Sequence, residues 1–437
     1  MKKSALLSAV LVFASIGLVS CGAASSYSST PSKFTTRVLA SQGVSSPTAA
    51  AGLVLIDGWI DTLGRGGVSA GNSPGLMAIS PDRSVLLSFD SSSNKVYVTN
   101  TKTDASTGSI QLPGPTISLA IPVDSSAYAA VPSAPLIGSS PGAVVAMNLA
   151  AGGVAWTVNV PNAQRVVSNP SGTLLLVFSN DSDSVTVVSP QLVNTGNPVT
   201  VTVAGFDRPV NAVYSSDGST AYILNCGAQC GGQHASVQVL DFSTTPPTPG
   251  AKVLVNGATD AYLSGSTLYV AGLGTPTGPL CASIPSAATT AAQYCGYLDI
   301  VNLNTMQDPY YNNPTSEIAI TNGYHDRMDL SSNGQLFVGS YGCTSVGDVN
   351  ATPQQGEIRG CLAIYNTTNG AVVMPPDNGD VTGLQSFSTR YVEYVAEGGN
   401  LRVYDTTIDS LLINQYIETG TITVTGQVID IRAIDFF

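Results

Sequence analysis

The chain has 437 residues, of which 43% are hydrophobic and only 10% are charged, and its mean hydropathy is +0.21. A soluble domain usually carries about 25% charged residues, so this surface must be built from Ser, Thr, Asn and Gly. The composition argues against a disordered chain, which needs high charge, and against a coiled coil, which needs Glu, Lys and Ala. The formal net charge of −12 argues against nucleic acid and anionic lipid as partners, because no basic stripe is present. We therefore expect an exported β protein.

The first twenty residues are typical of a secretion signal. Met1-Lys2-Lys3 is positively charged, and residues 4–19 form an uncharged apolar run that is too short for a stable membrane span. The segment ends in Leu18-Val19-Ser20-Cys21, which resembles the lipobox of bacterial lipoproteins. This resemblance implies a signal peptide over residues 1–20 and an acylated Cys21. The alternative is an ordinary signal peptide followed by a coincidental cysteine.

Residues 21–36 are rich in Ser and Thr and are predicted to form a tether. An acylated Cys21 on such a tether would hold a folded body beside a membrane without inserting that body. Gly22, rather than Asp, follows the cysteine, and by analogy with lipoprotein sorting this favours the outer membrane of a bacterial cell envelope. The body would lie on its periplasmic or surface side. No later stretch reaches about 18 apolar residues, so the lipid anchor is the only membrane contact expected.

A unit of four short strands recurs along residues 37–437, which we assign to one domain. Copies begin near residues 73, 115, 163 and 208, and weaker copies begin near Thr259, His325 and Leu384. Tight turns such as Ser216-Asp217-Gly218 and alternating strands such as Val237-Gln238-Val239-Leu240 fill each unit. Four strands in roughly 50 residues is the size of one blade of a β-propeller.

One segment also carries a family resemblance. After the turn at Pro81-Asp82, the run Val96-Tyr97-Val98-Thr99-Asn100 resembles the repeat of the YVTN β-propeller family. In later units the tetrapeptide degrades to Tyr222-Ile223-Leu224-Asn225 and Tyr269-Val270-Ala271-Gly272. The resemblance covers most of residues 40–437 and implies the architecture but not the function.

The two ends of the domain are predicted to build one blade together. Residues 428–434 look like a first strand with nothing after it, whereas residues 37–40, 53–56 and 61–63 look like second, third and fourth strands. Joining them would remove the exposed sheet edges of a linear array. We therefore predict an all-β fold, a single propeller of eight four-stranded blades closed by this composite blade. Seven blades, the family's usual number, is the alternative.

Six cysteines remain after Cys21, an even number that indicates disulfides in an exported chain. Each neighbouring pair falls inside one loop between a second and a third strand, in units four, five and six. Position therefore favours the local pairs Cys226–Cys230, Cys281–Cys295 and Cys343–Cys361. The spacings match no zinc pattern, so a metal site is not expected.

Long loops of this kind crowd one face of a propeller. Strand two-to-three and strand four-to-one connections emerge on the same side, which places residues 132–142, 226–236, 273–296 and 342–360 there. Long ordered loops are often functional. Loops closed by a disulfide, which we call stapled loops, lose less conformational entropy when they bind a partner. The alternative is that they are neutral insertions, stapled only for survival outside the cell.

The candidate binding residues lie in or beside these loops. Aromatic rings there could stack on a sugar or grip a peptide, and a His beside Asp and Arg could act as a general base. The alternative for the histidines is a solvated surface cluster, and some tyrosines are expected to be core residues. The candidate set is His234, Tyr294, Tyr297, Tyr324, His325, Asp326, Arg327, Tyr341 and Arg359.

Other chemistries find weaker support. Asn180-Asp181-Ser182-Asp183-Ser184 has oxygen ligands at calcium-like spacing but no bidentate Glu downstream, and is better explained as a hairpin turn. Quinone-dependent propeller dehydrogenases use recurrent tryptophans, but only Trp59 and Trp156 are present. We expect no cofactor and no metal. A serine hydrolase is not indicated, because no Gly-x-Ser-x-Gly elbow with supporting context appears.

Two functional hypotheses remain after these chemistries are weighed. The favoured one is a non-catalytic, monomeric envelope module that binds a protein or glycan partner through the stapled loops. The alternative is a hydrolase similar to propeller lactonases, with acids and His325 around the channel mouth. Whether His325, Asp326 and Arg327 point into that mouth distinguishes the two. The opposite face should carry mainly tight turns, with Tyr310 and Tyr311 as an exception.

Overall fold

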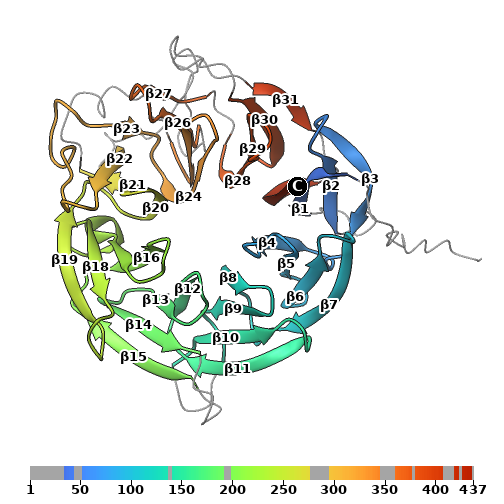
Figure 1. Cartoon of the computed structure of the whole chain (residues 1–437), viewed down its shortest axis with the longest axis horizontal. Coiled ribbons are helices and arrows are strands. Elements are labelled where there is room, and N and C mark those ends of the chain that lie inside the picture. The colour runs from blue at the N-terminus through green and yellow to red at the C-terminus, as the bar shows by residue number, and fades with distance from the viewer. Residues whose placement is uncertain are drawn as a thin grey trace, which may run out of the picture.

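The computed structural model describes residues 34–43, 52–135, 140–190, 198–275, 295–344, 360–375, 379–406, 418–422 and 426–435. These residues form eight four-stranded antiparallel sheets arranged as blades around a central channel (Figure 1). The only helix among them is the short 3-10 turn η1 (Gly227–Cys230). The prediction of an all-β propeller with eight blades is confirmed, and the alternative of seven is excluded.

In each blade the first strand lines the channel and the fourth lies outermost. The strands of the first four blades, in order from the channel outward, are as follows: β4 (Pro74–Ile79), β5 (Val85–Asp90), β6 (Lys95–Asn100) and β7 (Ala105–Gln111) in blade 1; β8 (Ser118–Val123), β9 (Ser126–Val131), β10 (Ala143–Asn148) and β11 (Gly153–Asn159) in blade 2; β12 (Ala163–Ser168), β13 (Leu175–Ser179), β14 (Ser184–Ser189) and β15 (Val199–Ala204) in blade 3; and β16 (Pro209–Tyr214), β17 (Ala221–Asn225), β18 (Ser236–Asp241) and β19 (Thr248–Leu254) in blade 4.

The remaining strands complete the ring: β20 (Asp260–Ser264), β21 (Thr267–Gly274), β22 (Cys295–Asn302) and β23 (Ala319–Ile320) in blade 5; β24 (Tyr324–Leu330), β25 (Gln335–Tyr341), β26 (Leu362–Asn366) and β27 (Val372–Val373) in blade 6; β28 (Val381–Ser386), β29 (Val392–Glu397), β30 (Asn400–Asp405) and β31 (Glu418–Ile422) in blade 7; and β32 (Gln427–Asp435), β1 (Thr36–Gly43), β2 (Leu53–Asp57) and β3 (Thr62–Val68) in the composite blade.

The composite blade closes the ring as the sequence predicts. Strand β32 is its channel strand, and β1 pairs with it from Thr36 opposite Asp435 to Gly43 opposite Gln427. The antiparallel pairing joins strands nearly 400 residues apart in the chain. Both edges that a linear array would expose are thereby hydrogen-bonded.

Strand alternation explains why the blades pack into a ring. Successive side chains of a strand point to opposite faces of its sheet, so each blade sends alternate residues to its two neighbours. In β10, Val144 and Ala146 pack into the cluster shared with blade 3, whereas Val145 and Met147 pack into the cluster shared with blade 1. One hydrophobic cluster fills each of the eight interfaces between neighbouring blades. The core is therefore a set of inter-blade layers around the channel.

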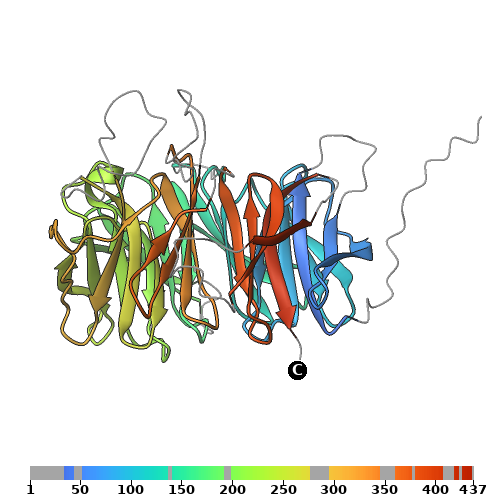
Figure 2. The ribbon, with the colours of Figure 1, turned by 90° about the horizontal axis from the view of Figure 1, so that it is seen from above.

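The propeller has two faces, which we name by their connections (Figure 2). The loop face holds the strand two-to-three and four-to-one connections, and the turn face holds the others. Two predicted disulfides are present on the loop face, Cys226–Cys230 and Cys343–Cys361. Cys281 lies outside the described residues, so its pairing with Cys295 stays a prediction, as does the acylation of Cys21. No helix in the described part of the chain is long and apolar enough to cross a membrane.

Candidate binding site at the channel mouth

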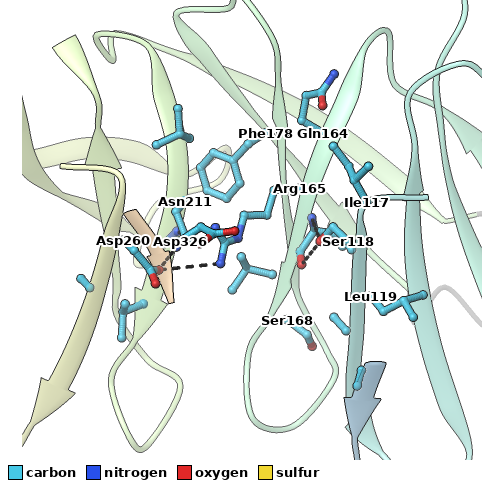
Figure 3. Close-up of a pocket in the computed structure, with 18 of the residues that line it drawn as sticks. Ile117, Ser118, Leu119, Gln164, Arg165, Ser168, Phe178, Asn211, Asp260 and Asp326 are labelled. Atoms are coloured by element: carbon cyan, nitrogen blue, oxygen red, sulfur yellow. Dashed lines mark hydrogen bonds and ion pairs between the residues drawn. The ribbon is translucent and has the colours of Figure 1, made fainter. Parts of the chain in front are cut away.

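The central channel opens into a cavity of about 1270 Å³. Its walls come from the inner strands of the blades, and Figure 3 shows the part formed by blades 2 to 6. The charged residues of the wall number four Arg and four Asp, so their formal charges cancel when all are ionised. They are Arg165, Arg208, Arg327, Arg432, Asp181, Asp260, Asp326 and Asp329.

Asp260 is the centre of a polar network that joins three blades. Its Oδ1 accepts a hydrogen bond of 2.8 Å from Nδ2 of Asn211 and lies 3.7 Å from Nη2 of Arg165. These residues belong to β20, β16 and β12 (Figure 3). Burial raises the pKa of Asp260 to about 6, and the positive charge of Arg165 opposes this rise. A carboxyl group in this setting can change protonation near neutral pH.

Asp326 and Arg327 form a second polar group on β24. Nη1 of Arg327 donates to Oδ2 of Asp326 at 2.8 Å, and its Nε donates to the carbonyl of Thr382 at 3.0 Å. Burial raises the pKa of Asp326, although Arg327 and Arg165 lower it. Burial disfavours the charged form of Arg327, but the neighbouring carboxylates outweigh it and raise its pKa. The guanidinium is thus held charged and oriented.

Register shifts at the loop-face ends of the inner strands help to position these groups. One falls between Ala163 and Arg165, one between Pro209 and Asn211, and one between His325 and Arg327. A β-bulge adds one residue and re-aims the side chains that follow it. In all three blades the residue after the shift lines the cavity.

Two aromatic rings lie beside the charged groups. Tyr324 pairs with Tyr341 across β24 and β25, and their ring centroids are 5.3 Å apart with planes inclined by 37°. Both residues line the cavity, and Tyr341 is 46% exposed. Burial raises the pKa of Tyr324 to about 12, so its phenol stays neutral. The ring of Tyr341 is therefore available to a ligand entering from the loop face.

The expectation that His325 faces the loop surface is wrong. Its side chain is fully buried, and its Nε2 lies 2.8 Å from the carbonyl oxygen of Thr321. Burial lowers its pKa to about 4, so the imidazole is neutral at physiological pH. His234 is exposed but does not line the cavity, and its backbone N–H donates to Asp207 at 2.7 Å. The two histidines therefore do not join the Asp and Arg residues in a general-base cluster.

The prediction that Tyr297 belongs to the binding face is also wrong. It is fully buried in blade 5, and its hydroxyl donates to the carbonyl of Thr275 at 3.2 Å. It is a core residue and offers no exposed surface. Tyr294 and Arg359 lie outside the described residues. Of the nine candidates, Tyr324, Asp326, Arg327 and Tyr341 are the ones the structure brings together at the cavity.

The sequence-based candidates omitted Arg165, Asn211 and Asp260. A signal for the first two was present, because Ala163-Gln164-Arg165, Pro209-Val210-Asn211 and His325-Asp326-Arg327 occupy equivalent positions in their repeats. Aligning the repeats on the start of the first strand would have grouped them with Arg327. Asp260 carries no comparable signal, because no register shift occurs in its strand.

The stapled loops are fixed to their neighbours on the same face. Cys230 itself lines the cavity, and Oε1 of Gln229 accepts a 2.9 Å hydrogen bond from the backbone N–H of Leu273 in blade 5. Next to Cys343, the backbone N–H of Thr344 donates to Oδ1 of Asn322 at 2.7 Å. The described parts of these loops thus form a firm rim around the mouth.

Comparison with known proteins supports the fold alone. No protein-family model and no curated protein matches this chain. Among solved structures, the dihydro-heme d1 dehydrogenase NirN in complex with DHE is 10% identical, covering 91% of this chain and 75% of that one, with a TM-score of 0.58. A functionally unknown protein from Desulfotomaculum acetoxidans is 12% identical, covering 91% and 98%, with a TM-score of 0.53. A periplasmic gluconolactonase from Pseudomonas aeruginosa is 13% identical, covering 91% and 99%, with a TM-score of 0.48.

Proposed function

We propose that this protein is a non-catalytic envelope module that binds a neutral glycan at the channel mouth of a lipid-anchored propeller. One observation carries the proposal: the Tyr324–Tyr341 ring pair shares a cavity wall with the Asp326–Arg327 pair and the Asp260 network. A sugar presents an apolar ring face, which stacks on an aromatic ring, and hydroxyls, which bind carboxylate and guanidinium groups. The cavity wall offers both an aromatic ring and charged groups to the same ligand.

Charge and size narrow the ligand class. The four Arg and four Asp of the wall cancel, so a phosphorylated or polyanionic ligand would gain no net attraction. A cavity of about 1270 Å³ exceeds the roughly 300–1,000 Å³ that suits one small molecule. A neutral oligosaccharide, rather than a single sugar, suits both properties.

Calorimetric titration with a panel of neutral and anionic oligosaccharides tests the proposal. We expect binding of neutral members and a loss of at least tenfold in affinity for Tyr341→Ala. Tyr311→Ala is the matched control, because Tyr311 is also exposed but lies away from this cavity. Equal loss in both variants, or binding of anionic members only, would contradict the proposal.

A second candidate, lactone hydrolysis, is favoured by the carboxyl group of Asp260. With a pKa of about 6 beside Arg165, it could accept a proton from water as the water attacks a lactone carbonyl, while Arg165 stabilises the oxyanion. The ring C–O bond of the ester would then break as Asp260 returns the proton to the departing alkoxide oxygen, which releases a hydroxy acid and regenerates the carboxylate. We favour binding because this hydrolysis gives no role to the Tyr324–Tyr341 ring pair in the same cavity wall. A lactone panel decides: turnover that Asp260→Asn abolishes while ligand binding persists would establish the hydrolase.

A further inference from the structure

Large apolar side chains are exposed mainly on the turn face. Ten such side chains are exposed in the described part of the chain, and seven of them lie at strand ends or connections of this face. Ile117 and Tyr341 lie toward the loop face. Tyr311 belongs to the β22–β23 connection, but Tyr310 and Asn312 on either side of it bond to Asn256 in a four-to-one connection of the loop face, so we do not count Tyr311 with the turn face. The seven are Trp59, Ile60, Leu63, Val123, Val154, Val199 and Tyr391.

Four of the seven gather where the composite blade meets blade 7. Trp59 and Ile60 lie between β2 and β3 and are 67% and 59% exposed, and Leu63 on β3 is 46% exposed. Tyr391, 53% exposed, follows Arg390 in the connection between β28 and β29. We call Trp59, Ile60, Leu63 and Tyr391 the apolar corner.

Buried and charged contacts hold this corner in place. Nη1 and Nη2 of Arg390 donate to the two carboxylate oxygens of Asp61 at 2.6 and 2.9 Å, and Arg390 also contacts the carbonyl of Gly58. The hydroxyl of Tyr394 donates to Asp61 as well. The backbone N–H of Trp59 donates to Oδ1 of Asp57 at 2.9 Å. The exposure of Trp59 and Ile60 is therefore imposed by a fixed framework, since bidentate Arg–carboxylate pairs are geometrically specific.

The N-terminal end of the described chain enters at the same corner. The backbone N–H of Gly58 donates to the carbonyl of Thr36 at 3.0 Å, and Nη1 of Arg37 donates to the carbonyl of Phe34 at 2.8 Å. Only residues 22–33 separate Phe34 from Cys21. The thirteen steps from Cys21 to Phe34 span at most roughly 45 Å. A bilayer that holds an acyl chain on Cys21 must therefore lie within that distance of the corner.

We propose that the apolar corner rests on the lipid bilayer that carries the Cys21 acyl chain. Trp and Tyr favour the boundary between headgroups and acyl chains, where an apolar ring and a polar tip are both satisfied. One acyl chain alone holds a protein only weakly, so a second contact strengthens the anchor. The acidic chain favours zwitterionic over anionic lipid. The inference rests on acylation of Cys21 and not on the proposed glycan site.

Tryptophan fluorescence tests this contact directly, because the chain has only two tryptophans. Trp156 is half-buried and packs on Tyr128 with ring centroids 5.8 Å apart, so Trp156→Phe isolates the emission of Trp59 with little disturbance. The exported, acylated Trp156→Phe protein is placed in phosphatidylcholine vesicles with and without brominated acyl chains. We expect a blue shift and at least twofold quenching by bromine. Trp59→Phe, which reports Trp156, should show neither.

Exchange between vesicles gives a second readout. Trp59→Ser combined with Ile60→Ser should speed transfer of the acylated protein between vesicles severalfold, whereas Ile117→Ser, a matched exposed residue on the other face, should not. Unquenched Trp59 emission or unchanged transfer overturns the proposal. So does mass spectrometry showing no acyl group on Cys21. Self-association in solution that Trp59→Ser abolishes, with no response to vesicles, would assign the corner to a second copy of the chain instead.

Discussion

Arg37 and Asp104 form a buried ion pair that joins the composite blade to blade 1. Nε of Arg37 lies 2.9 Å from Oδ1 of Asp104, and their side chains are 4% and 6% exposed. The guanidinium also contacts the carbonyls of Phe34 and Thr101. One side chain near the start of the domain therefore ties the closing blade to the blade that follows it in the ring.

Removing the charge of Asp104 should weaken this closure. Asp104→Asn leaves the buried guanidinium uncompensated, and we expect a loss of about 3–5 kcal/mol in the free energy of unfolding. Asn is chosen because Asp104 has φ of 51°, a backbone conformation that Asn tolerates. Asp183→Asn is the control, since its pair with Arg208 is 3.7 Å long and Asp183 is 65% exposed. Denaturant unfolding with equal effects in the two variants would refute the prediction.

Two tyrosines near the loop face, Tyr297 in blade 5 and Tyr341 in blade 6, should separate an effect on stability from an effect on binding. Tyr297 is fully buried, so Tyr297→Ala should cost about 3–5 kcal/mol, as other large-to-small core substitutions do. Tyr341 is 46% exposed, so Tyr341→Ala should change the free energy of unfolding by no more than about 1 kcal/mol. The same substitution should lower the affinity for the glycan. Thermal unfolding and calorimetric titration of both variants measure the two effects. A stable Tyr297→Ala that loses binding would argue against the core assignment.

Glu393 should make the protein less stable as pH rises. Its side chain is fully buried, and Asp329 is its charged neighbour. Burial, together with the charge of Asp329, raises the pKa of Glu393 well above 4.5. Above pH 4.5 the unfolded chain releases this proton while the folded chain retains it, so stability falls with rising pH. Glu393→Gln should raise the thermal midpoint by a few degrees at about pH 8 and by nothing below about pH 4.

His325 should make the protein less stable as pH falls. Its pKa falls from 6.5 to about 4 on folding because burial disfavours the imidazolium. As pH falls from 6.5 toward 4, His325 takes up a proton in the unfolded chain but stays neutral in the folded chain. This difference lowers the free energy of unfolding by about 3 kcal/mol. His325→Gln should lack this part of the acid dependence. Parallel denaturant titrations at several pH values test it, and identical slopes in the two proteins would show the prediction to be wrong.

Glycan affinity should depend on the protonation of Asp260. With a pKa of about 6, its carboxylate accepts ligand hydroxyls above that pH and loses this capacity, together with its charge pairing to Arg165, below it. Asp326 and Arg327 keep their mutual pairing. We expect the dissociation constant to rise about tenfold as pH falls through 6, since a hydrogen bond to a charged group contributes about 1.5–3 kcal/mol. Asp260→Asn should bind weakly with no pH step. A step that survives in this variant would assign the titration to another group.

Strand alternation made the architecture predictable and the site harder to predict. Val38 and Ala40 pack toward blade 7, whereas Leu39 packs toward blade 1, as a period of two requires, so the closing strands could be found in the sequence. The same rule would send His325 and Arg327 to one side. A register shift between them breaks the rule, so His325 is buried while Arg327 lines the cavity.

The remaining site residues depend on the closed ring. Arg165, Asn211 and Asp260 come from three blades, and the first and last are 95 positions apart in the sequence, so only the curvature of the ring brings them together. No local pattern encodes that distance. A search restricted to the long loops therefore finds the rim of the cavity but not the inner strands that form its wall.

The pairing of β1 with β32 also sets the order of events during biogenesis. Strand β1 is made early, yet its partner at Gln427–Asp435 is synthesised only after every other blade. Until those residues have been synthesised, β1 has an unpaired edge that can pair with other chains. A protein whose last strand is delayed or clipped would leave seven finished blades in an open ring. Exposure of a single strand edge therefore distinguishes an incomplete chain from a complete one.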